Sequence, residues 1–256
     1  MLPSARIGAA IARAKESGRP AIVAFMTAGH PDRAGFVATL NRVGAAADVI
    51  EIGVPFTDPM ADGMTIQRAS QGALRAGVTL TWILEELAAA PVKPAVPLLL
   101  MSYLNPLLRY GYGRLAAAAQ RAGVSGFIVP DLPNEEAGEF AAALAGEGIA
   151  LVQMVTPVTP AERLESLCRG AQGFVYAVTM TGTTGKQVEV PDDVLAYLDR
   201  VRAASGVPVC AGFGIRSAAQ VARLAPHVDG VVVGSALVEV LEQGADPAAF
   251  LAGLKG

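Results

Sequence analysis

The sequence has few of the residues that would point to metal, disulfide or nucleic-acid chemistry. It contains two cysteines, two histidines, and 20 lysine and arginine residues against 23 aspartate and glutamate residues. Cys168 and Cys210 are too few for a disulfide scaffold and favour a reducing compartment. His30 and His227 lie far apart and lack the spacing of metal ligands. The net charge of −3 gives no electrostatic case for nucleic acid or an anionic membrane surface.

The chain also lacks a long hydrophobic run. Although 52% of its residues are hydrophobic, no apolar stretch approaches the roughly 20 residues that would span a bilayer. The N-terminal segment MLPSARIGAAIARAKESG mixes charges with apolar residues at helical spacing, which predicts a helix and not the uninterrupted apolar core of a signal peptide. We therefore expect a soluble cytoplasmic protein.

What the sequence does contain is a series of eight short apolar runs, each bounded by Gly, Pro or Asp as buried strands are. The runs begin at Ala21, Ala47, Ala95, Gly126, Ala150, Gly173, Pro208 and Gly230. Helical patterns rich in Ala, Leu and Glu separate them, as in residues 134–148. Buried strands that alternate with helices predict a parallel sheet covered on both faces. Eight such units predict a single (β/α)8 TIM-barrel domain over residues 1–256, with an extra N-terminal helix.

An open, doubly wound sheet is the alternative architecture. Such a fold carries a glycine-rich phosphate turn after its first strand, whereas the first run here leads into MTAGHPD, which lacks that fingerprint. The interval from Ala47 to Ala95 is twice as long as the interval from Gly126 to Ala150. This excess predicts an elongated loop with its own helical piece after the second strand, where barrels place functional residues.

The second run, VIEIGV, contains one carboxylate. Alternation places Val49, Glu51 and Gly53 on one face and three large aliphatic residues on the other, which we expect to pack against helices. Glu51 then points into the barrel near the C-terminal rim, where the active sites of such barrels lie. No run contains Lys or Arg, so a cation that holds Glu51 would have to come from a loop. Without one, desolvation raises the pKa of Glu51 and suits it to proton transfer near neutral pH.

Three further carboxylates lie near the same rim. Asp62, in the long loop, is equally typical of an Asx turn when read alone, but with Glu51 it forms a candidate acid/base pair. Asp58 fits a turn equally well. Asp131 ends the fourth run, and its alternative role is to cap the helix predicted to begin near residue 134.

Glycine-bearing loops follow the last three runs. They are TGTTG at 181–185, GFG at 212–214 and GSA at 234–236. Glycine lets backbone N–H groups approach an anion closely, and the helix predicted after the last loop begins near Ser235 with its N–H groups free. Phosphate sites in these barrels commonly use the loops after strands 7 and 8. The three loops favour a phosphate site, and ordinary turn glycines remain the alternative.

The residue content excludes two common kinds of aldolase. A Schiff-base aldolase needs a lysine in an apolar pocket, and a metal-dependent aldolase needs clustered His and carboxylate ligands. The sequence offers neither pattern, which leaves cofactor-free acid/base chemistry on a phosphorylated substrate. Phe25, Met101, Tyr103, Tyr176 and Phe213 are among the apolar residues expected around the rim, and they favour an aromatic or apolar substrate moiety.

Several segments resemble the tryptophan synthase alpha chain family. The longest is IEIGVPFTDPMADGMTIQ, and MSYLNPLL, VPDLPNEE, GFGI and GVVVGSALV follow in the family's order. The matches run from about Phe25 to Val238, so the resemblance covers nearly the whole chain. Met64 stands where the family usually has proline. The resemblance implies a TIM-barrel lyase of tryptophan biosynthesis that cleaves indole-3-glycerol phosphate to indole and D-glyceraldehyde 3-phosphate by retro-aldol acid/base chemistry.

The resemblance also implies roles for single residues. The family's catalytic glutamate and aspartate fall on Glu51 and Asp62, where Glu51 moves protons and Asp62 accepts the indole N–H bond and stabilises positive charge. The implied substrate-binding residues are Phe25, Met101, Tyr103, Tyr176, Thr184 and Phe213. The implied phosphate-binding residues are Gly185, Gly214, Gly234 and Ser235. No metal is implied.

A partner is implied as well. The family's beta chain carries pyridoxal phosphate and receives indole through a tunnel, which implies an alpha-beta-beta-alpha heterotetramer with no cofactor in this chain. The positions that match the family's interface are Pro55, Asp58, Pro59, Asn105 and Asp131.

Three other functions stay open at this point. A stand-alone indole-3-glycerol phosphate lyase would share every catalytic residue. A related barrel isomerase or epimerase would keep the phosphate loops but would not need the PFTDPMADG loop. A non-catalytic sugar-phosphate-binding regulatory subunit is expected to have lost Glu51 or Asp62, and both are present.

Overall fold

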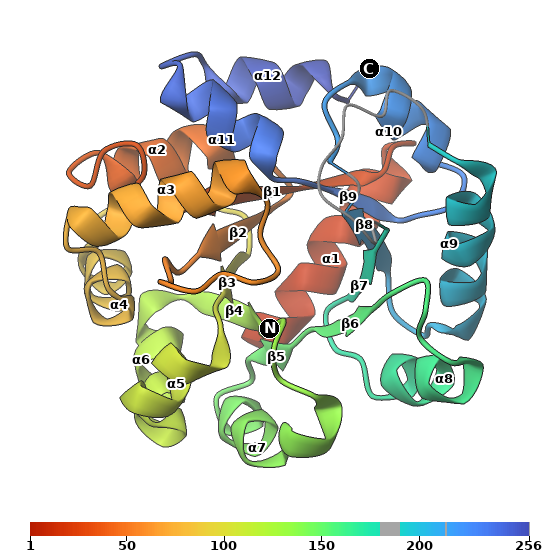
Figure 1. The fold of residues 1–256 in the computed structure, drawn as a ribbon, viewed down its shortest axis with the longest axis horizontal. Helices are drawn as coiled ribbons and strands as arrows, with labels where there is room; N and C mark the ends of the chain where they lie inside the picture. The colour runs from red at the N-terminus through yellow and green to blue at the C-terminus, as the bar shows by residue number, and fades with distance from the viewer. Residues whose placement is uncertain (180–189, 213, 256) are drawn as a thin grey trace.

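All strands of the described residues belong to one parallel sheet that curls around a central axis (Figure 1). The structure is a computed structural model and describes residues 1–179, 190–212 and 214–255. The strands are β1 (Ala21–Thr27), β2 (Val49–Gly53), β3 (Leu98–Met101), β4 (Val124–Ile128), β5 (Ala150–Leu151), β6 (Gln153–Val155), β7 (Val175–Val178), β8 (Val209–Gly212) and β9 (Gly230–Val233). Their order in the sheet is β5-β4-β3-β2-β1-β9-β8-β7-β6. The predicted TIM barrel is confirmed, and the open sheet is not formed.

The fifth predicted strand differs from expectation because it is split into β5 and β6. β5 pairs with β4 through Ala150 and Leu151, whereas β6 pairs with β7 from Gln153 onward. Val152 stands between the two pieces, and its N–H group still donates to the carbonyl of Phe127 at 2.9 Å. The strand therefore changes its hydrogen-bonding partner halfway along, and the barrel wall separates between β4 and β6 at its C-terminal end.

A ring of helices surrounds the strands (Figure 1). They are α2 (Phe36–Gly44), α3 (Met64–Arg75), α4 (Leu80–Ala89), α5 (Leu104–Tyr110), α6 (Tyr112–Ala122), α7 (Gly138–Gly146), α8 (Ala161–Arg169), α9 (Asp192–Ala204), α10 (Ala218–Leu224), α11 (Ser235–Glu242) and α12 (Pro247–Gly253). The elongated segment predicted after β2 holds both α3 and α4. The helix predicted from Asn134 begins as a 3₁₀ turn, η1 (Asn134–Glu136), and becomes α-helical only at Gly138. None of the helices in the described part is long and apolar enough to cross a membrane.

The extra N-terminal helix, α1 (Pro3–Glu16), closes the end of the barrel where the strands begin. Its apolar face buries Ile7, Ala10, Ile11 and Ala14. Ile7 packs against Gly126, in the middle of β4, and against Gly173, two residues before β7. Because this end is filled with side chains, the site is confined to the opposite end, where the strands terminate.

The alternation predicted for β2 is confirmed. Ile50 and Ile52 pack in the apolar layer between the sheet and the helices, whereas Val49 belongs to the interior cluster that α1 covers. Glu51 points to the interior like Val49 and is fully buried, with an exposed fraction of 0%. The strand register sets Glu51 beside Phe25 of β1 on one side and Leu99 of β3 on the other.

Candidate active site

A cavity of about 220 Å³ opens where the strands end. It is lined by Phe25, Glu51, Ala61, Asp62, Gly63, Ile66, Met101, Met154, Tyr176, Val178, Gly212, Gly214, Val232, Gly234 and Ser235. These residues come from β1, β2, β3, β6, β7, β8 and β9 and from the loops behind them. Strands far apart in the sequence therefore contribute to one concave, mostly apolar site that contains two carboxylates.

Glu51 has no partner that would stabilise its charge. Neither carboxylate oxygen has a hydrogen-bond partner among the described residues, and none of the ion pairs found there involves Glu51. Burial raises the pKa of Glu51 to about 8, and the charge of Asp62 adds to the rise. This is the direction that the sequence predicts. The alternative, a glutamate held by a loop cation, finds no such cation in the described part of the chain.

Asp62 is held at the cavity by several contacts. Burial raises its pKa to about 6, while a hydrogen bond from the Tyr103 hydroxyl acts in the opposite direction. The same hydroxyl accepts the backbone N–H of Ala61 at 2.8 Å, so its own proton is available for the Asp62 carboxylate. Gln67 Nε2 donates to the Asp62 carbonyl at 2.9 Å. Tyr103 thus lies behind the loop, outside the residues that line the cavity.

Met64 begins the helix that follows Asp62. It occupies the first position of α3, where proline is favoured because its ring fixes a helical φ. Its side chain is 72% exposed. The departure from the family's usual proline therefore leaves the cavity wall untouched.

Apolar side chains make up much of the cavity lining. Phe25, Met101 and Tyr176 all line the cavity, as expected of an aromatic-binding wall. Tyr176 lies against Gly212, where an added Cβ would come within 2.8 Å of the Tyr176 hydroxyl oxygen. Ile66 also lines the cavity and was not expected from the sequence, because its position on a helix gives no sign of which face meets the barrel.

The loops after β8 and β9 both contribute glycines to the lining of this cavity. Gly214 has a φ of 68°, a conformation that glycine adopts without strain. Gly234 precedes α11, and Ser235 is the first residue of that helix, so free N–H groups face the cavity end. Three further predicted residues, Thr184, Gly185 and Phe213, lie outside the described residues.

Of the five positions predicted to meet a partner, four lie in the loops that follow β2 and β4, and Asn105 lies in the first turn of α5. Asp58, Asn105 and Asp131 are exposed, Pro59 is partly exposed, and Pro55 is buried. The alternative role of Asp131 is wrong: its Oδ1 accepts the N–H of Leu104 at 2.8 Å, at the beginning of α5. Proline precedes η1, and no side chain caps that turn.

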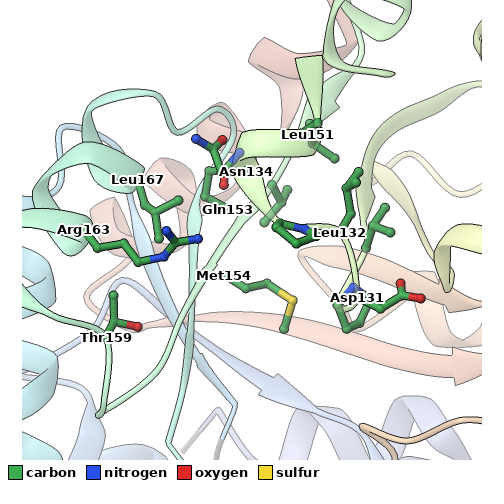
Figure 2. Close-up of a pocket in the computed structure, with 14 residues that line it drawn as sticks. Asp131, Leu132, Asn134, Leu151, Gln153, Met154, Thr159, Arg163 and Leu167 are labelled. Atoms are coloured by element: carbon green, nitrogen blue, oxygen red, sulfur yellow. The ribbon is translucent and has the colours of Figure 1, made fainter. Parts of the chain in front are cut away.

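A second cavity of about 310 Å³ borders the first (Figure 2). It lies where β4 and β6 separate, between the loop that carries Asp131 and the beginning of α8. Met154 lines both cavities, and Figure 2 shows its side chain between those of Arg163 and Asp131 in this view. Within the described residues, no group of three His, Cys, Asp or Glu side chains is placed to hold a metal ion.

The fold and the site define a class of protein: a TIM barrel whose rim brings two carboxylates of raised pKa together with glycine-bearing loops after β8 and β9. The family model described as "Tryptophan synthase alpha chain" matches residues 11–252. A tryptophan synthase alpha chain of Desulfovibrio desulfuricans is 46% identical over 245 residues, which are 94% of this chain and 96% of the relative. Another, from Nitratidesulfovibrio vulgaris, is 43% identical over 251 residues, which are 98% of each chain.

Solved structures of tryptophan synthase are similar to this chain over nearly its whole length. A tryptophan synthase structure from Mycobacterium tuberculosis has a TM-score of 0.90 at 36% identity and covers 98% of this chain and 96% of that one. The tryptophan synthase subunit alpha of Legionella pneumophila has a TM-score of 0.88 at 31% identity, with 100% and 97% covered. The chain belongs to the tryptophan synthase alpha chain family, which confirms the resemblance.

Proposed function

We propose that Glu51 and Asp62 carry out the reaction of this family, the cleavage of indole-3-glycerol phosphate to indole and D-glyceraldehyde 3-phosphate. The chain is then a carbon–carbon lyase of tryptophan biosynthesis. One observation carries the assignment of roles. Glu51 is fully buried without a hydrogen-bond partner among the residues that the structure describes, and burial raises its pKa to about 8, whereas the pKa of Asp62 in the same cavity is raised to about 6. Near neutral pH, one group holds a proton while the other is ionised.

The two protonation states fit the two halves of a retro-aldol cleavage. Protonated Glu51 donates to the indole ring carbon that bears the side chain, and the ring becomes a cationic indolenine. The Asp62 carboxylate accepts the ring N–H and stabilises this positive charge. The Glu51 carboxylate then removes the proton of the adjacent side-chain hydroxyl. As the carbonyl forms, the carbon–carbon bond breaks and its electron pair returns to the ring, so that Glu51 ends protonated.

The lining of the cavity supports one orientation of the substrate. The indole packs against the apolar wall of Phe25, Met101 and Tyr176. The phosphate lies at the end where Gly214, Gly234 and the N-terminus of α11 supply backbone N–H groups. By the family pattern, Thr184, Gly185 and Phe213 complete the site.

A beta chain is the partner we propose for the opening of the barrel. Exposed apolar side chains stand on three rim segments: Met60 is 85% exposed, Leu108 51% and Val158 77%. Met60 and Leu108 lie in the segments that also carry Asp58 and Asn105, and exposed apolar residues there fit a protein interface. In the proposed alpha-beta-beta-alpha assembly, pyridoxal phosphate belongs to the beta chain and this chain holds no cofactor of its own.

The test is indole release from indole-3-glycerol phosphate, measured with the chain alone and with a tryptophan synthase beta chain. We expect release that rises when the beta chain is added and that falls when Glu51 is replaced by Gln. Full activity without a partner would identify a stand-alone lyase. No release in either case, with Glu51→Gln indistinguishable from the wild type, would overturn the proposed function.

A further inference from the structure

Helix α11 carries acidic residues on the face that leads away from the cavity. Ser235, Glu239 and Glu242 are spaced at i, i+4 and i+7, so they share one side of the helix. Ser235 lines the cavity at the anion-binding end. The next residue on this face, Glu239, lies one turn further along the helix and makes contacts in two directions.

The first contact of Glu239 reaches the loop after β8. Arg216 Nη1 donates to Glu239 Oε2 at 2.6 Å, and Arg216 Nη2 donates to Glu239 Oε1 at 3.0 Å. Arg216 follows Gly214 by two residues, and its own N–H group donates to Gln220 Oε1 at 2.8 Å, at the beginning of α10. The side chain and the backbone N–H of Arg216 therefore both hold this loop in place.

The second contact of Glu239 reaches the segment that carries Asp62. Thr65 Oγ1 donates to Glu239 Oε1 at 3.2 Å. Thr65 is in the first turn of α3, three residues after Asp62. A single carboxylate thus bonds to both the loop at the anion end and the helix that anchors the second catalytic candidate.

We propose that Glu239 is a positioning residue that sets the distance between the phosphate-binding loop and Asp62. The inference rests on the proposed function, because it takes that phosphate end and that aspartate as the two ends of one substrate. Arg216 is then not a phosphate ligand: both of its terminal nitrogens bond to Glu239.

The Arg216–Glu239 ion pair contributes more to the geometry of the site than to the folding free energy. The Arg216 and Glu239 side chains are 54% and 31% exposed, and ion pairs this exposed add little to folding free energy. The two parallel bonds of an arginine–carboxylate pair nevertheless fix direction as well as distance. A small displacement between a binding end and a reacting group can lower turnover strongly, since the substrate must meet both at once.

The experiment is a set of three single variants assayed for indole release with the beta chain present. Glu239→Gln keeps the shape of the side chain but loses the charge-assisted pair, and we expect KM to rise and kcat to fall, each by about 3- to 10-fold. Arg216→Gln is expected to raise mainly KM. Thr65→Val is expected to lower mainly kcat. The double variant Arg216→Gln/Thr65→Val is expected to approach Glu239→Gln in both constants.

The matched control is Glu242→Gln. Glu242 also joins α11 to α3, through Arg68 at 2.6 and 3.1 Å, but it lies further along the helix, and among the described residues it has no hydrogen bond or ion pair with the Arg216 loop. We expect wild-type KM and kcat for this variant. Equal losses in Glu239→Gln and Glu242→Gln would indicate a general bracing of the helix and would overturn the inference, as would wild-type constants in Glu239→Gln.

A binding measurement separates this inference from the proposed reaction. Glycerol 3-phosphate serves as the probe in titration calorimetry, which needs no turnover. Glu239→Gln and Arg216→Gln are expected to weaken its binding by about 3- to 10-fold, and Thr65→Val is expected to leave it unchanged. If the wild type binds the probe but releases no indole, the proposed function fails while the positioning role is still tested. Equal affinity in the wild type and in Glu239→Gln overturns the positioning role alone.

Discussion

Two carboxylates close together in the sequence behave in opposite ways. Asp48 immediately precedes β2, and Glu51 is the middle residue of that strand. Asp48 accepts bonds from both terminal nitrogens of Arg19, at 2.6 and 2.8 Å, and from the N–H of Ile22 at 2.8 Å. These bonds outweigh burial and lower its pKa below the ordinary value of 3.8. Glu51 is more deeply buried and has no hydrogen-bond partner in the described part of the chain, and its pKa is raised to about 8.

The opposite pKa shifts of Asp48 and Glu51 distinguish a carboxylate that stabilises the fold from one that is suited to proton transfer. At the closed end of the barrel, the charge of Asp48 is matched by an arginine and a backbone donor, so ionisation stabilises the fold. Inside the barrel, no described residue matches the charge of Glu51, so ionisation destabilises the fold and the proton stays available for transfer. A bound substrate with a proton acceptor or donor next to Glu51 would provide the hydrogen-bond partner that the described residues do not.

The largest expected effect comes from removing the exchangeable proton of Glu51. Glu51→Gln keeps the size of the side chain but can neither give nor take a proton, so we expect kcat for indole release to fall about 1,000-fold. The measurement is steady-state indole release with the beta chain present. The matched control is Asp48→Asn, on the same strand, for which we expect wild-type kcat per folded molecule. A loss below tenfold in Glu51→Gln would show that another group moves the proton.

Asp62 should have the next largest effect. Asp62→Asn removes the negative charge that faces the cationic ring, and loss of one such electrostatic contact lowers kcat by about 100-fold. KM should change little, because the proposed phosphate contacts come from the loops after β8 and β9 and not from the loop that carries Asp62. If kcat were unchanged while KM rose, Asp62 would act in ground-state binding and not on the charge that develops in the reaction.

The two carboxylates should also oppose each other in stability. Between pH 4.5 and pH 8, Glu51 keeps a proton in the folded chain that the unfolded chain has released, so stability falls as pH rises through this window. Glu51→Gln removes this slope, and we expect it to be more stable than the wild type at pH 8. Asp48 has the opposite sign: its contribution is present above about pH 4 and is lost as pH falls through its lowered folded pKa.

Asp48→Asn should therefore destabilise the protein at pH 8, by about 2 kcal/mol, because the bonds from Arg19 and Ile22 lose their charged acceptor. Urea unfolding of both variants and of the wild type, at pH 5 and pH 8, measures the two effects together. A Glu51→Gln variant less stable than the wild type at pH 8 would mean that Glu51 has a stabilising partner in solution.

The contrast between Asp48 and Glu51 also shows how far the sequence leads. Alternation in β2 is a local property, so the inward direction of Glu51 and the lack of cations on the strands could be read directly. Hydrogen-bond partners that lie far away in the chain could not be predicted from the sequence. Arg19 reaches Asp48 across 29 positions, and Thr65 reaches Glu239 across 174. Both contacts depend on how helices and loops are arranged around a finished barrel.

The strands, too, could be predicted from the sequence only where the signal is local. Each buried parallel strand reads as an apolar run, which is why eight runs predict the barrel. The split of the fifth run into β5 and β6 has no signal in the residues, because it depends on which neighbour each half finds in the closed sheet. The second cavity, which opens at that split, was unforeseen for the same reason.

The smallest expected effect concerns a residue that acts on Asp62 from behind. Tyr103 donates a hydrogen bond that lowers the pKa of Asp62, and its ring stacks on Phe56 with centroids 5.0 Å apart. Tyr103→Phe keeps the stacking and removes the bond, so the pKa of Asp62 should rise above about 6. Because Asp62 acts as a carboxylate, the acidic limb of the pH profile of kcat should move to higher pH. At pH 8 the loss should be only about threefold, since Asp62 is ionised there in both proteins. An unshifted acidic limb would mean that a group other than Asp62 sets it, and would leave Glu51 as the only carboxylate whose protonation governs the reaction.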